Sequence, residues 1–130
     1  MWIYHFEGHS KLAPFAGRVI ESLEAGKFRG VASELTLLEL TARPLQLGRQ
    51  DVADDYEVLL GYFPNLELHP ISREVLLEAA GLRARYRLRT PDAIQIVTGL
   101  HAGATLAVTN DDAWRNLPLI ETVILSDPAE

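Results

Sequence analysis

The sequence predicts an α/β fold in which a mostly parallel sheet is flanked by helices. Short apolar segments, typical of buried strands, alternate along the chain with amphipathic segments at helical spacing. This alternation is typical of crossover units, which join parallel strands through helices. Because 130 residues suit one hydrophobic core but not two, we expect residues 1–130 to form a single domain.

The first half of the chain contains most of the predicted helices. Pro14 suits a first helical turn, and Gly26 suits the C-terminal cap of the same helix. Pro44 is expected to end or kink a later helix. An acidic run in the next helix is interpreted as a solvated face. The predicted elements are helices at 13–25, 34–43 and 51–60 and a strand at 30–33.

The second half of the chain contains the remaining strands and two helices. Ser72 is the expected N-cap of a helix that extends through Leu82. Thr90 is the expected N-cap of the next helix, with Pro91 at its first helical position. A helix of this length followed by a short turn suits a crossover to another parallel strand. The predicted elements are helices at 72–82 and 90–101 and strands at 66–69, 106–109 and 121–125.

Composition and motifs exclude several classes of function. No apolar run approaches the roughly 18 residues of a membrane span, and the N-terminus lacks the pattern of a signal peptide, so a cytoplasmic protein without membrane contact is expected. The sequence contains no cysteine and no short-spaced histidine pair, so a bound metal would need oxygen ligands, which favours Mg²⁺ or Mn²⁺. A net charge of −6 argues against broad electrostatic attraction to nucleic acid.

Three carboxylates are candidate metal ligands. Glu39 lies in the helix after the first strand, Asp92 lies in the opening turn of a later helix, and Asp111 follows the strand at 106–109. In parallel sheets, sites form outside the C-terminal ends of the strands. Carboxylates gathered there repel one another unless a cation neutralises them. The alternative for Glu39 is a solvated side chain on the flank of its helix, or one paired with Arg43 at i+4.

An arginine-rich segment precedes Asp92. Arg83, Arg85, Arg87 and Arg89 alternate with other residues, and Tyr86 lies among them. Guanidinium groups that contact phosphates, beside a ring that stacks on a base, would form an RNA-binding edge. The alternative is a basic helix C-terminus that favours the helix dipole.

The chain resembles a PIN domain, and among PIN domains it is similar to the toxin of a VapBC toxin–antitoxin pair. The resemblance is carried mainly by Thr90-Pro91-Asp92-Ala93 and Thr109-Asn110-Asp111, at their characteristic spacing. Further matching segments follow the family's order through nearly the whole chain. These segments are residues 3–8, 33–40, 82–94 and 108–111.

The resemblance implies a three-layer sandwich with an acidic metal site. It implies that Glu39, Asp92 and Asp111 match the metal-binding positions, with Asn110 or Thr109 in a supporting role. It also implies an endoribonuclease that depends on Mg²⁺ or Mn²⁺. Such a toxin is usually a homodimer, and a small cognate antitoxin wraps it with a C-terminal segment.

One feature of the family is missing before Trp2. PIN domains begin with a hydrophobic strand that ends in Asp, and this strand lies in the middle of the sheet, between the strands matched by 31–33 and 106–108. We therefore expect an N-terminally short PIN-like domain, in which the sequence starts late, the sheet is rearranged or another chain fills the gap.

Without the first Asp, a second hypothesis is a catalytically impaired module that binds an antitoxin or RNA without cleaving it. A third hypothesis is an unrelated α/β domain in which the three acids are surface residues.

Overall fold

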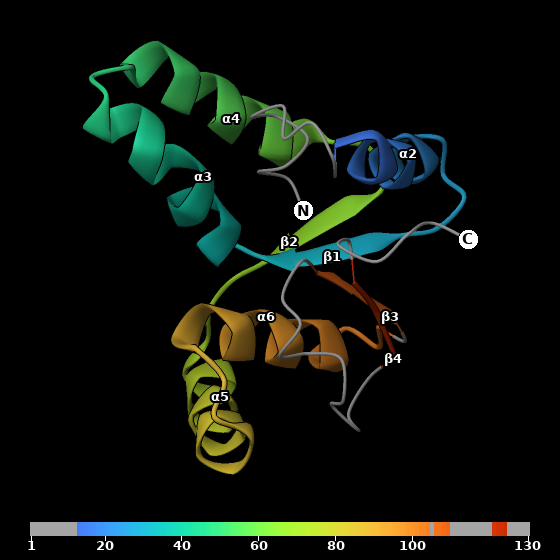
Figure 1. Cartoon of the computed structure of the whole chain (residues 1–130), viewed down its shortest axis with the longest axis vertical. Coiled ribbons are helices and arrows are strands. Elements are labelled where there is room, and N and C mark those ends of the chain that lie inside the picture. The colour runs from blue at the N-terminus through green and yellow to red at the C-terminus, as the bar shows by residue number, and fades with distance from the viewer. Residues whose placement is uncertain (1–12, 105, 110–120, 125–130) are drawn as a thin grey trace.

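The computed structural model describes residues 13–104, 106–109 and 121–124, with side chains described from 18 to 104. Helices and strands alternate along these residues (Figure 1). The α/β class predicted from the sequence is confirmed. None of the described helices is long and apolar enough to cross a membrane. The helices are α2 (Ala13–Glu24), α3 (Leu35–Gln46), α4 (Gln50–Tyr62), α5 (Arg73–Tyr86) and α6 (Thr90–His101), and the strands are β1 (Gly30–Ser33), β2 (Leu66–His69), β3 (Leu106–Thr109) and β4 (Glu121–Ile124).

The described strands form two parallel pairs. In one pair, β1 runs beside β2 with Gly30 opposite Leu66 and Ser33 opposite His69. In the other pair, β3 runs beside β4. Both pairs have the parallel direction predicted by the alternation of strands and helices. The helices α3 and α4 form the crossover from β1 to β2, so the C-terminal ends of β1 and β2 meet at the start of α3 (Figure 1).

A close contact between α2 and β1 favours glycine at position 30. A Cβ atom there would lie only 3.0 Å from a methyl carbon of Leu23 and 3.2 Å from one of Leu66. Asn65, in the left-handed conformation, donates from its side-chain amide at 3.0 Å to the Leu23 carbonyl, which also accepts from the Gly26 amide at the end of α2. These contacts fix the position of β1 and hence of the loop that follows it.

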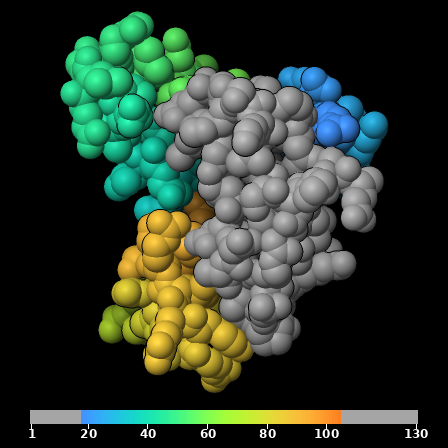
Figure 2. Space-filling view, in the orientation of Figure 1, coloured from blue at the N-terminus to red at the C-terminus, as the bar shows by residue number. Residues whose placement is uncertain are grey.

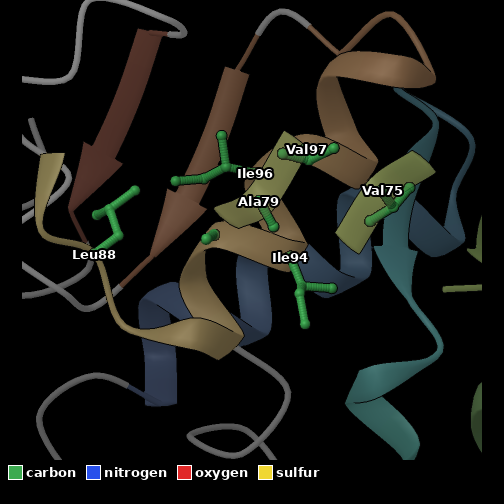
Figure 3. Packing of buried hydrophobic residues seen from close by; sticks show 7 residues of the cluster. Val75, Ala79, Leu88, Ile94, Ile96 and Val97 are labelled. Carbon is green, nitrogen blue, oxygen red and sulfur yellow. The ribbon is translucent and has the colours of Figure 1, made fainter. Parts of the chain in front are cut away.

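Two separate hydrophobic clusters stabilise the described part of the chain. The first joins α5 to α6, and Figure 3 shows its side chains on the two helices and, at Leu88, on the segment between them. The second joins α2, α3 and α4, with partly buried residues of β2 packed against it. Leu35, at the start of α3, packs against the first cluster, whereas Leu37 packs against the second. The start of α3 therefore lies where the two clusters meet. The buried members are Val75, Ala79, Leu88, Ala93, Ile94, Ile96 and Val97 in the first cluster and Ile20, Leu23, Leu40 and Leu60 in the second.

The helices predicted at 51–60 and 72–82 extend to Tyr62 and Tyr86. Two further helix boundaries also differ from the prediction. The first is at Pro44, which the sequence analysis expected to end or kink its helix; α3 continues through Pro44 to Gln46. Proline lacks the amide hydrogen that would bond to the preceding turn, but this loss is confined to the last turn of α3. Pro44 is buried, and its carbonyl accepts from the Arg49 amide at 2.8 Å. Burial of Pro44 and the hydrogen bond to its carbonyl outweigh the free-energy cost of the helical hydrogen bond that proline cannot make.

The second wrong boundary is at the start of α6. Thr90 is the first helical residue rather than the N-cap, and Arg89 takes the N-cap position in an extended conformation without a side-chain capping bond. Pro91 has no amide hydrogen, so one of the donors that an N-cap side chain would satisfy is already absent. Ser72, by contrast, caps α5 as predicted, because its hydroxyl accepts from the Val75 amide at 3.1 Å.

Candidate functional site

The C-terminal end of β1 carries a buried polar residue. Ser33 is completely buried, and its hydroxyl accepts from the Leu35 amide at 3.1 Å, which satisfies a free donor at the start of α3. The amides of Gly30 and Glu34 bond to carbonyls at the two ends of β2. Because alternate residues of a strand bond to opposite edges, the amide of Ser33 points to the edge of β1 away from β2.

Gln95, on α6, satisfies that amide. Its side-chain oxygen accepts from the Ser33 amide at 3.0 Å. Its side-chain nitrogen donates to Thr36 Oγ1 at 3.0 Å and lies 3.4 Å from Glu39 Oε1. One side chain therefore connects β1, α3 and α6. Ala93, Ile94, Ile96 and Val97 anchor this part of α6 in the first hydrophobic cluster, so Gln95 projects from a fixed helix.

Glu39 is exposed on α3, two turns after β1. Its carboxylate contacts Gln95 and, within the described residues, forms no ion pair with Arg43. The alternative of an i+4 pair is therefore not what the structure shows. Figure 2 shows the residues at the start of α3, coloured teal, next to those of α6, coloured orange.

Asp92 lies in the first turn of α6, where a negative charge is favoured by the helix dipole. Its side chain is only 14% exposed, and Oδ2 accepts from Arg89 Nε at 3.0 Å. Since residues three apart on a helix share a face, Asp92 and Gln95 lie on the same side of α6. The structure thus brings Glu39 to the face of α6 that carries Asp92, with Gln95 as the link. We call these three residues the Glu39–Asp92 site.

The third predicted acid is not described. Asp111 and the supporting Asn110 lie outside the described residues. Thr109, the other supporting residue, is the last residue of β3, and only its backbone is described. All three stay predictions.

The four predicted RNA-binding arginines have different surroundings. All four are exposed, but Arg83 donates to the Leu88 carbonyl at 3.0 Å and Arg89 pairs with Asp92. Arg87 ends α5 in the left-handed conformation, with φ of 56°. The four arginines therefore do not form one continuous edge in the structure, because α5 ends between Arg85 and Arg87.

A second group of possible metal ligands lies elsewhere. Glu74 and Glu78 on α5 and His101 at the end of α6 each offer one ligand atom, and these atoms lie within 4.8 Å of one another. All three residues are exposed, and His101 Nε2 lies 2.6 Å from Glu78 Oε2. We call this group the Glu74–Glu78–His101 cluster. An open hollow of about 260 Å³ between α5 and α6 is lined partly by Glu78 and Arg85.

Sequence reasoning missed Ser33, Thr36 and Gln95. A signal was present for Gln95, because it is the single polar residue in Ala93–Val97, one turn after Asp92. Its three partners, however, lie 56 to 62 residues earlier in the chain, and no periodicity within one helix predicts such contacts.

Comparison with known proteins identifies the family. Residues 1–119 match the PIN domain. The chain belongs to the PIN domain family. The resemblance noted from Asp92 and Asp111 is thereby confirmed for the family as a whole. No curated protein sequence matches the chain significantly.

A solved structure shares the fold of this chain. A toxin–antitoxin complex from Klebsiella pneumoniae is similar to this chain with a TM-score of 0.63 and 21% sequence identity. The similarity covers 88% of this chain and 90% of that one. At this identity the comparison shows a shared fold.

The described residues of this PIN domain suit a hard divalent cation. Carboxylate oxygens, such as those of Glu39 and Asp92, are the ligands that Mg²⁺ and Mn²⁺ prefer. The oxygen donors of these two residues therefore fit such a cation, although the Arg89 guanidinium already pairs with Asp92.

Proposed function

We propose that this PIN domain is a metal-dependent endoribonuclease and the toxin component of a VapBC-type toxin–antitoxin system. Glu39, Asp92 and Asp111 are the proposed ligands of Mg²⁺ or Mn²⁺, with Thr109 and Asn110 in support. The proposal also takes residues 1–130 as a single cytoplasmic domain. PIN domains are generally nucleases, and the family match over residues 1–119 supports this class of reaction.

The observation that carries the proposal is the bridge made by Gln95. It contacts Glu39 at 3.4 Å and lies one helical turn from Asp92, which supports a shared site for two acids 53 positions apart in the sequence. The bridge lies at the C-terminal end of β1, the edge at which parallel sheets form their sites. The partly buried amide of Gln95 that contacts Glu39 supports a shared role for these acids.

The chain's own residues have separate tasks in this proposal. Glu39 and Asp92 would hold the cation and, as carboxylates, would accept hydrogen bonds from the attacking water. When bound there, a divalent cation would supply a water of lowered pKa and charge stabilisation for a phosphodiester. The exposed guanidiniums of Arg85 and Arg87 contact RNA phosphates, and Arg83 and Arg89 contribute positive charge beside them.

The proposed macromolecular partners are an RNA substrate, a cognate antitoxin and a second copy of the chain. The antitoxin is supported by the fold shared with a toxin–antitoxin complex. Local positive charge from the arginine segment is the feature that would attract RNA, since the whole chain carries a formal charge of −6.

Cleavage of a mixed RNA pool by the purified chain tests the proposal. The assay is run in Mn²⁺, in EDTA and with the Asp92→Asn variant. We expect cleavage in Mn²⁺ that EDTA abolishes and that Asp92→Asn lacks while remaining folded by circular dichroism. An inactive wild-type chain that still binds RNA would instead support a module that binds without cleaving.

A further inference from the structure

We propose that Gln95 is a positioning residue, which holds the Glu39 carboxylate in the orientation that metal binding requires. The inference rests on the proposed function, since it assigns a role within the same site. Gln95 is neither acidic nor basic, and its role is to orient a ligand rather than to be one.

The orientation of the Gln95 amide is determined by its surroundings. The oxygen and nitrogen of a glutamine amide are usually distinguished only through their partners. Here the Ser33 backbone amide can only donate, so the atom that faces it at 3.0 Å must be the Gln95 oxygen. The nitrogen must then face Thr36 Oγ1 and Glu39 Oε1, so Gln95 donates a hydrogen bond to the carboxylate.

The contacts with Ser33 and Thr36 hold this amide rigidly. Ser33 is completely buried and Thr36 is 7% exposed, so the partners of Gln95 in both bonds lie in the protein interior. Glu39, by contrast, has an exposed and flexible side chain, and its contact with Gln95 is the longest of the three. The buried bonds therefore fix the donor, and the donor in turn restricts the carboxylate.

A neutral amide suits this task better than a charged group. Gln95 donates to only one oxygen of Glu39, so the other oxygen and further lone pairs remain available to a cation. A lysine or arginine at this position would neutralise Glu39 and compete with the metal. Hydrogen-bonded partners that orient metal ligands in this way commonly contribute about 10–100-fold to metal affinity or activity.

The test measures Mn²⁺ binding to the full chain by isothermal titration calorimetry. We compare the wild type with Gln95→Met, Glu39→Gln and the double variant. If Gln95 acts through Glu39, Gln95→Met weakens Mn²⁺ binding about 10–100-fold in the wild type. In the Glu39→Gln background, Gln95→Met should then change the Mn²⁺ affinity by no more than about twofold. This is the variation expected between sites that do not interact.

Thr36→Val is the matched control variant. It removes one bond of Gln95 but leaves the contacts with Ser33 and Glu39, so we expect a much smaller loss of Mn²⁺ affinity than for Gln95→Met. An equal loss from Gln95→Met in both backgrounds would show that Gln95 supports the fold generally, and it would overturn the inference.

A second variant covers the case in which Gln95→Met does not fold, since it leaves the Ser33 amide without an acceptor. Gln95→Glu keeps an acceptor for Ser33 and for the Thr36 hydroxyl but cannot donate to Glu39. In this background Glu39→Gln should cost much less Mn²⁺ affinity than it costs in the wild type. The same cost in both backgrounds would contradict the inference.

Failure of the inference and failure of the proposed function have different results. Mn²⁺ binding that is lost in Asp92→Asn but unchanged in Gln95→Met would overturn the role of Gln95 alone. Binding that is unaffected by Asp92→Asn would overturn the proposed function, and the role of Gln95 with it.

Discussion

Two groups of acidic side chains lie at opposite ends of α6. Asp92, in the Glu39–Asp92 site, is in its first turn, and His101, in the Glu74–Glu78–His101 cluster, is its last residue. Nine residues separate them, which corresponds to about 14 Å along the helix axis. The two groups are therefore independent, although both offer oxygen ligands and one also offers an imidazole.

The two groups differ in what holds their side chains. In the Glu39–Asp92 site, bonds to buried Ser33 and Thr36 fix the amide that contacts Glu39. The Glu74–Glu78–His101 cluster is exposed throughout, and its contact between His101 and Glu78 already joins α5 to α6 as an ion pair when His101 is protonated. Proximity of ligand atoms alone does not define a functional site. Hydrogen bonds from buried residues that orient a ligand are stronger evidence.

The largest effect is expected when Glu39 is changed. Glu39→Gln should lower Mn²⁺-dependent RNA cleavage by at least about 10–100-fold, because removal of a ligand should cost no less than removal of its hydrogen-bonded partner. Glu74→Gln, the matched change in the other group, should leave cleavage unchanged. Equal losses in the two variants, measured as initial rates at saturating Mn²⁺, would remove the distinction between the groups.

A smaller effect is expected at Arg89. This side chain is 74% exposed and pairs with Asp92, so it stabilises the metal-free carboxylate. Arg89→Gln should strengthen Mn²⁺ binding by up to about fivefold, the equivalent of an exposed ion pair of up to about 1 kcal/mol. Calorimetry measures the affinity. Weaker Mn²⁺ binding in the variant would show that Arg89 supports the site rather than competing with the cation.

The smallest effect is expected in the exposed cluster. His101→Gln removes the ion pair with Glu78, and pairs this exposed contribute about 0.2–1 kcal/mol to stability. Urea denaturation should show a loss within that range, and RNA cleavage should not change. A His101→Gln variant that loses metal-dependent cleavage would indicate that this cluster has a role in catalysis.

Most helices and strands could be predicted from the sequence because their signals are local. The cap at Ser72, the apolar faces and the glycine at the end of α2 each act within a few residues. The two wrong boundaries show where local signals fail. Pro44 remains helical because it is buried in the last turn, and Thr90 is helical because Pro91 already removes a donor.

The candidate site could be predicted only in part. Glu39 and Asp92 were predicted from residue type, position and resemblance, and in the structure Gln95 contacts Glu39 one helical turn after Asp92. Gln95 could not be found in this way, because its function depends on contacts with β1 and α3 that only the packing of α6 creates. Residues that orient ligands are defined by tertiary contacts rather than by sequence pattern.

The most direct test is Mn²⁺ binding to two variants with matched changes. Asp92→Asn and Glu78→Gln each remove one carboxylate charge, at opposite ends of α6. If the Glu39–Asp92 site holds the cation, Asp92→Asn abolishes high-affinity Mn²⁺ binding and Glu78→Gln leaves the affinity within about twofold of the wild type. Loss of binding in Glu78→Gln, with binding retained in Asp92→Asn, would contradict the assignment of the metal site.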